Sequence, residues 1–249
     1  MRYDAVLAET TGIRGADGDL VEAYTARPMD PGPRGGVLVI HHMPGYDREA
    51  KEIVRRFAVD GYDAIAVNLH WRDAPGADPD DAAAASRANG GVPDDRFVGD
   101  AAGAVRWLRE RPTSNGRVGT IGFCSGGRQA VLSAIELDVQ AAIDCYGAFV
   151  TAEPPEGFPI RVRPIADRLG DVRAPLLGLF GNDDRNPSPA QVNELEKLLR
   201  GHGKTYDFHR YDGAGHAFFS VDRPSYRVAA ALDGWQRIHT FLATHLREG

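Results

Sequence analysis

Short apolar segments rich in β-branched residues alternate along this chain with longer stretches whose apolar residues recur at helical spacing. Such alternation is typical of a parallel sheet covered by helices on both faces, because parallel strands need long crossover connections. The segments that have the composition of buried strands are 36–41, 63–69, 117–123, 141–146, 176–180 and 205–211. We therefore expect an α/β fold with a mostly parallel central sheet, formed by residues 1–249 as one domain.

The segments between these strands divide into helical and irregular ones. Apolar residues share one helical face in 50–57, 98–108 and 192–199, and a last helix is expected near 224–246. Residues 5–28 have the pattern of two half-buried strands joined by a Gly/Asp turn, which predicts an antiparallel hairpin at the edge of the sheet. Segment 74–95, rich in Ala, Asp, Gly and Pro, is expected to form a loop beside the site. Segment 151–172 is expected to cross the top of the sheet.

Charge and hydropathy narrow the classes of function. The net charge is −6 and the basic residues are scattered, so nothing indicates binding to nucleic acid. No apolar run approaches the roughly 20 residues that span a bilayer, and the first ten residues contain acids where a signal peptide would be apolar. We therefore expect a cytoplasmic protein with a small-molecule substrate and no membrane partner. A disulfide between Cys124 and Cys145 is not expected in a reducing compartment.

The most informative stretch is RVGTIGFCSGG at 117–127, which places Cys124 between Gly122 and Gly126 directly after an apolar strand. This spacing is that of the nucleophile elbow of α/β-hydrolases, with sulfur where serine is more usual. A sharp strand-to-helix turn needs small neighbours because a Cβ there would collide with backbone. On this pattern alone Cys124 is either a nucleophile or a packed thiol, whereas Cys145, inside an apolar strand, is expected to belong to the core.

Other strand ends carry groups that could complete a site, since ligands of open α/β sheets bind at the carboxyl ends of the strands. GNDD at 181–184 and GAGH at 213–216 each follow a predicted strand, and the order thiol, acid, histidine is that of the α/β-hydrolase triad. A thiol needs a nearby base, here His216, and the histidine needs an acid to orient it. Asp183 and Asp184 are both candidates for that acid, and either could instead cap the next helix.

The remaining histidines and one arginine have two interpretations each. His41, His42 and His70 lack the company of a metal-site motif, so we expect no metal and assign them to strand-end packing or to the lining of the site. Arg72 is either a solvated loop cation or a group that binds an anionic part of the substrate.

Together these motifs resemble those of the dienelactone hydrolases, the carboxymethylenebutenolidase-like branch of the α/β-hydrolases. The resemblance rests on VLVIHHMPG, NLHWRDAPG, GTIGFCSGGRQA, DCYGAF, LLGLFGNDD and YDGAGHAFF. It implies an α/β-hydrolase fold without a cofactor. It also implies hydrolysis of a lactone or small ester through a cysteinyl acyl-enzyme, with Cys124 as nucleophile, His216 as base and Asp184 as acid. The backbone N–H groups of Met43 and Ser125 match the oxyanion hole.

Two positions depart from the family pattern. His42 stands where the family carries a glutamate that holds the resting cysteine. Of the two family arginines that bind a substrate carboxylate, one is matched by Arg72, but Ser220 stands at the second. We expect His42 and Arg72 to contact the substrate, which is a related lactone or ester rather than the dienelactone itself. A thioesterase or acyltransferase with the same triad, and a non-catalytic ligand-binding protein on this fold, remain alternatives.

Overall fold

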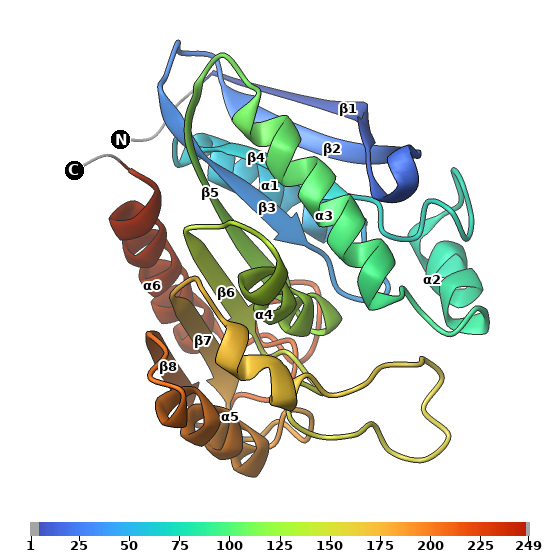
Figure 1. Cartoon of the computed structure of the whole chain (residues 1–249), viewed down its shortest axis with the longest axis vertical. Coiled ribbons are helices and arrows are strands. Elements are labelled where there is room, and N and C mark those ends of the chain that lie inside the picture. Colours follow the sequence, from blue (N-terminus) through green and yellow to red (C-terminus); the bar gives the residue numbers. More distant parts are fainter. Residues whose placement is uncertain (1–4, 248–249) are drawn as a thin grey trace.

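A single eight-stranded sheet runs through the computed structural model, which describes residues 5–247 (Figure 1). Its strand order is β1-β2-β4-β3-β5-β6-β7-β8. The six strands that pair in parallel are β3 (Arg34–Ile40), β4 (Asp63–Val67), β5 (Ser114–Phe123), β6 (Ala141–Cys145), β7 (Leu176–Gly181) and β8 (Tyr206–Tyr211). All six strands predicted from the apolar runs are confirmed.

An antiparallel hairpin extends one side of the sheet. β1 (Val6–Arg14) pairs with β2 (Leu20–Pro28), a short 3-10 turn (η1, Ala16–Gly18) joins them, and β2 pairs antiparallel with β4. β1 is the edge strand, so the predicted edge hairpin is confirmed.

Helices cover both faces of the sheet, which explains why its central strands are apolar on both sides. α1 (Arg48–Val59) and α6 (Val228–Leu246) pack on one face, and α3 (Asp94–Arg109), α4 (Ser125–Glu136) and α5 (Pro189–Gly201) on the other (Figure 1). Successive residues of β3 alternate between the two layers, with Val37 and Val39 in one core cluster and Leu38 and Ile40 in the other. The parallel strands therefore end at a common edge between two helical layers.

Segment 74–95 differs from the expected loop, because it contains α2 (Pro79–Ala88). The local sequence favours a helix: Pro79 stands at its first turn, Asp80 and Asp81 lie near its N-terminus, and a run of alanines follows. The segment does lie beside the site, as described below. Residues 151–165 contain no helix or strand and precede a 3-10 turn, η2 (Ala166–Asp171).

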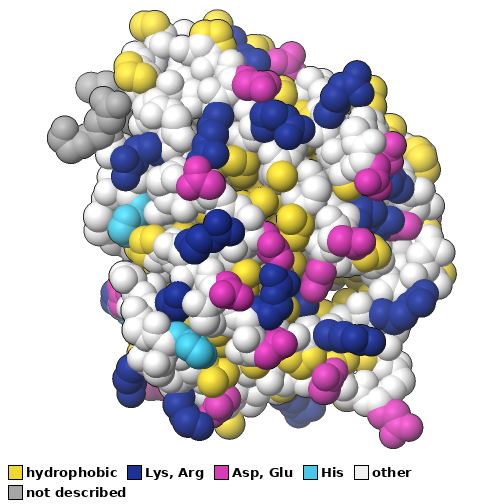
Figure 2. Space-filling view, in the orientation of Figure 1, with side chains coloured by type: hydrophobic (Ala, Val, Ile, Leu, Met, Phe, Trp, Pro, Cys, Tyr) yellow, Lys and Arg dark blue, Asp and Glu magenta, His cyan; other side chains and the backbone are white. Residues whose placement is uncertain are grey.

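The face of the molecule drawn in Figure 2 carries charges of both signs. Basic and acidic side chains are interspersed over the face drawn in Figure 2, as the scattered charges in the sequence predict. Among residues 5–247 no helix has both the length and the apolar character that a membrane crossing requires.

Candidate active site

Cys124 occupies a sharp turn between β5 and α4. Its backbone has φ 57° and ψ −119°, and α4 begins at the next residue. The two glycines of the motif leave no room for side chains: a Cβ on Gly122 would lie 1.8 Å from the carbonyl oxygen of Gly126, and one on Gly126 would lie 2.3 Å from that of Ile40. The Cys124 N–H donates to the carbonyl of Cys145 at 3.1 Å. This close packing explains the Gly-x-Cys-x-Gly spacing and leaves the thiol of Cys124 partly exposed, whereas Cys145 is buried.

His216 and Asp184 meet in the loops that follow β8 and β7. His216 Nδ1 lies 2.8 Å from Asp184 Oδ2, and Asp184 Oδ1 accepts the N–H of Asn186 at 2.9 Å. Asp184 is buried, whereas Asp183 is exposed and its carboxylate has no hydrogen-bond or ion-pair partner within residues 5–247. Neither aspartate caps α5, whose N-cap is Ser188. The geometry therefore favours Asp184 over Asp183 as the partner of His216.

His216 also links this pair to the thiol. Burial disfavours its protonated form, but hydrogen bonds with Asp184 and Cys124 outweigh burial and raise the pKa of His216 to about 10. The ring of Tyr146 packs edge-on against the imidazole, with 5.1 Å between ring centroids. The three residues predicted to form a triad are thus one connected group.

A cavity of about 290 Å³ opens next to Cys124. Met43 and Ser125 both line it, as expected of residues that form an oxyanion hole, and Ser125 is the first residue of α4, where backbone N–H groups lack helical acceptors. The apolar part of the wall consists of Leu69, Val92, Ala148, Phe149, Phe158, Ile160 and Val162. The cavity therefore suits a compact molecule with a mainly hydrocarbon skeleton.

Three arginines line this cavity, and they differ in their partners. Arg128 is held by Asp94 through two hydrogen bonds of 2.7 and 2.8 Å, and Arg161 donates to the Asn89 carbonyl at 2.9 Å. Arg87 lies in the last turn of α2, and its guanidinium makes no hydrogen bond or ion pair with any residue from 5 to 247. Its guanidinium is therefore available to a ligand. Sequence reasoning missed Arg87 because it assigned segment 74–95 to a loop.

Arg72 is not among the residues that line the cavity, which differs from the expectation that it contacts the substrate. Its guanidinium lies 2.9 and 3.0 Å from the two oxygens of Asp100 and 2.9 Å from Asp19. Asp100 is fully buried in α3, and a buried carboxylate needs a cation or several donors. Arg72 thus links the turn after β1 to α3 and has a structural role.

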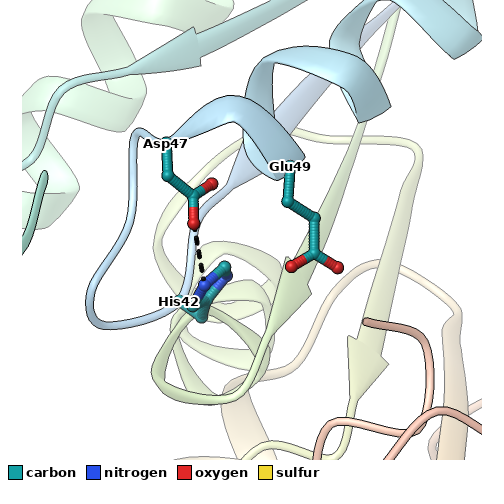
Figure 3. A group of neighbouring side chains, drawn as sticks. All are labelled: His42, Asp47 and Glu49. Atoms are coloured by element: carbon teal, nitrogen blue, oxygen red, sulfur yellow. Dashed lines mark ion pairs between the residues drawn. The ribbon is translucent and has the colours of Figure 1, made fainter. Parts of the chain in front are cut away.

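His42 lines the cavity, but its imidazole lies against Asp47, at the start of α1 (Figure 3), and against Arg223. Its Nε2 lies 3.2 Å from Asp47 Oδ2 and 3.3 Å from Arg223 Nη2. Together with Glu49, His42 and Asp47 place potential metal-ligand atoms within 4.8 Å of one another. Because the guanidinium of Arg223 faces the His42 nitrogen that lies nearest Asp47, this geometry favours a cluster of hydrogen-bonding side chains over a metal site.

An eight-stranded, mostly parallel sheet with a cysteine at the elbow and a His–Asp pair behind later strands defines an α/β-hydrolase. Comparison with known proteins specifies the family: the dienelactone hydrolase family model matches residues 21–246, and the chain belongs to this family. It is therefore a hydrolase of the lactone and carboxylic ester class.

Individual members of the family are similar in sequence to this protein over most of its length. A protein of Escherichia coli K12 named "Putative carboxymethylenebutenolidase" is 34% identical over 241 residues, which cover 94% of this chain and 86% of that protein. A protein of the same name from Methylorubrum extorquens is 33% identical over 222 residues, covering 88% and 75%. The crystal structure of "Putative Dienelactone Hydrolase" from Klebsiella pneumoniae superimposes with a TM-score of 0.86 at 29% identity, covering 97% of this chain and all 100% of that one.

Proposed function

We propose that this protein hydrolyses a lactone or small carboxylic ester through a thioester formed on Cys124. The observation that carries the proposal is the position of His216, whose Nδ1 lies 2.8 Å from Asp184 Oδ2 and whose imidazole interacts with the thiol of Cys124. A buried carboxylate that orients a histidine, which in turn ionises a nucleophile, is the arrangement that acyl transfer needs.

The reaction proceeds in two halves. The Cys124 thiolate attacks the carbonyl carbon, and the backbone N–H groups of Met43 and Ser125 stabilise the oxyanion. The C–O bond then breaks, and the imidazolium of His216 protonates the departing alkoxide, which stays attached to the acyl group when the substrate is a lactone. A water molecule, deprotonated by His216, attacks the thioester and releases the carboxylic acid and the thiol.

Arg87 is the group we assign to a carboxylate on the substrate. It lines the same cavity as Cys124, and its guanidinium has no hydrogen-bond or ion-pair partner within residues 5–247, whereas the guanidinium of Arg72 is held by Asp19 and Asp100. A guanidinium binds a carboxylate through two parallel hydrogen bonds. Arg87 would therefore fix the orientation of a carboxylate-bearing lactone in an otherwise apolar cavity.

An activity screen with lactones and aryl esters tests the proposal. Cys124→Ala should lose at least about 1,000-fold in kcat/KM, because the covalent route is removed. Cys145→Ala serves as the matched control, since that thiol is buried away from the cavity. Mass spectrometry of the quenched wild-type enzyme should show the acyl group on Cys124.

Three outcomes separate the alternatives. Preferential transfer of the acyl group to an added thiol or alcohol, rather than to water, would indicate an acyltransferase. Full activity of Cys124→Ala would exclude the nucleophile assignment, and a complete lack of turnover and of Cys124 labelling by any ester would support a non-catalytic binding protein.

A further inference from the structure

Two adjacent buried histidines in the wall of the cavity differ in whether their nitrogens have hydrogen-bond partners. His41 and His70 pack edge to face, with 5.0 Å between ring centroids, and both line the cavity. His41 uses both nitrogens: Nε2 accepts the N–H of Leu69 at 3.2 Å, and Nδ1 donates to the His42 carbonyl at 2.8 Å. His41 therefore joins the ends of β3 and β4 and has no capacity left for a ligand.

His70 is as buried as His41, with 2% of its surface exposed, yet its Nδ1 has no hydrogen-bond partner among residues 5–247. Its backbone N–H is occupied by Asn68, but no described residue makes a hydrogen bond with its imidazole. Buried polar groups in native proteins are nearly always paired, and an unpaired one costs free energy. A polar side chain of this kind in a cavity wall indicates that a ligand supplies the missing partner.

A second polar side chain in the same wall also lacks a hydrogen-bond partner among the described residues, although its amide atoms are not fully buried. Gln129, one helical turn after Ser125 on α4, is only 8% exposed and lines the cavity, and its side-chain amide makes no hydrogen bond with residues 5–247. Burial, with Arg96 and Arg87 nearby, lowers the pKa of His70 to about 4, so its imidazole is neutral throughout the neutral range. Both side chains are therefore uncharged groups that can donate and accept.

We propose that His70, assisted by Gln129, is a specificity-determining residue that hydrogen-bonds an uncharged oxygen, a hydroxyl or a keto group, on the acyl part of the substrate. This inference rests on the proposed function, because it takes the cavity beside Cys124 as the acyl-binding site. The substrate class is then an oxygenated lactone or ester rather than a plain hydrocarbon one. This oxygen is additional to any carboxylate held by Arg87. His70 and Gln129 are uncharged, so neither could neutralise a second carboxylate.

The test compares p-nitrophenyl butanoate with its hydroxylated and keto analogues. The wild-type enzyme should prefer an oxygenated ester by roughly 10- to 100-fold in kcat/KM. His70→Phe keeps an aromatic ring against His41 but removes both nitrogens, so the preference should fall to within about 3-fold, chiefly through KM. His70→Asn, which retains a polar atom near the position of Nδ1, should restore part of it. His202→Phe, on the exposed end of α5, is the matched control and should leave the preference intact.

Binding to Cys124→Ala separates this inference from the proposed chemistry. Calorimetric titration with ketone isosteres of the same esters should show the same preference and the same dependence on His70, whether or not Cys124 is the nucleophile. Equal losses for plain and oxygenated esters in folded His70→Phe, or no preference in the wild type for any oxygenated analogue, would overturn the inference. Full activity of Cys124→Ala alongside a His70-dependent preference would overturn only the proposed function.

Discussion

His216 Nδ1 and Asp184 Oδ2 lie 2.8 Å apart, so a side-chain hydrogen bond links the loop after β7 to the loop after β8 at the candidate site. Asp184 is held in turn by the backbone N–H of Asn186 at 2.9 Å. A backbone group of its own loop thus fixes the carboxylate of Asp184, and this carboxylate in turn orients the imidazole of His216. Because only Asp184 contacts His216, substitutions of Asp184 and of its exposed neighbour Asp183 should have different effects on catalysis.

Asp184→Asn should lower kcat by about 1,000- to 10,000-fold, because the amide neither stabilises the imidazolium nor selects the productive tautomer. Asp183→Asn is the matched control and should change kcat less than about 3-fold, since its side chain is exposed. Steady-state kinetics on an aryl ester measures both. The reverse order of effects would transfer the acid role to Asp183.

The two thiols should differ greatly in reactivity. Cys124 is partly exposed beside His216, whereas burial and the neighbouring Asp144 raise the pKa of Cys145. Iodoacetamide at neutral pH should therefore alkylate Cys124 at least about 100-fold faster, and activity should disappear in step with that modification. Peptide mass spectrometry over time reports both rates. Faster labelling of Cys145 would contradict the assignment.

Substitution of Arg72 should affect mainly the stability of the protein, whereas substitution of Arg87 should affect mainly substrate binding. Arg72→Met leaves the buried carboxylate of Asp100 without its cation and should cost about 3 kcal/mol of unfolding free energy, with KM unchanged. Arg87→Met should leave stability within about 0.5 kcal/mol but raise KM for carboxylate-bearing lactones about 10-fold or more. Urea unfolding and steady-state kinetics supply the two measurements. A raised KM in folded Arg72→Met would return Arg72 to the substrate site.

Asp144 should make stability depend on pH. It is fully buried at the end of β6, its Oδ1 accepts the N–H of Gly147 at 2.7 Å, and its Oδ2 has no partner within residues 5–247. Burial raises the pKa of Asp144 to about 7. The folded state then holds a proton that the unfolded state has lost above about pH 4, so stability decreases as pH rises from about 4 to 7.

Asp144→Asn removes that titration. The variant should be more stable than the wild type by up to a few kcal/mol near pH 8, and the difference should vanish near pH 4. Urea unfolding across this range measures it. A difference that is constant with pH would mean that Asp144 stays ionised in the folded protein.

Much of the fold follows from local sequence, because strands buried on both faces must be continuously apolar and helices must show an apolar stripe. The positions of Cys124 and His216 were also predictable, since glycines mark the turns that carry them. The ion pairs of Arg72 could not be predicted, because its partners Asp19 and Asp100 are distant in sequence. α2 was mistaken for a loop since its alanines lack an apolar stripe, and Arg87 was missed with it.

The backbone of Cys124 has a consequence for how this protein could evolve. Its φ of 57° with ψ −119° is a conformation that glycine adopts freely and other residues adopt at a cost of about 1–3 kcal/mol. Cys124→Gly should therefore raise the unfolding free energy while abolishing catalysis, whereas Cys124→Ala, which keeps the Cβ, should not. Selection for reactivity and selection for robustness oppose each other at this residue. A descendant that is no longer selected for catalysis would gain stability by replacing Cys124 with glycine.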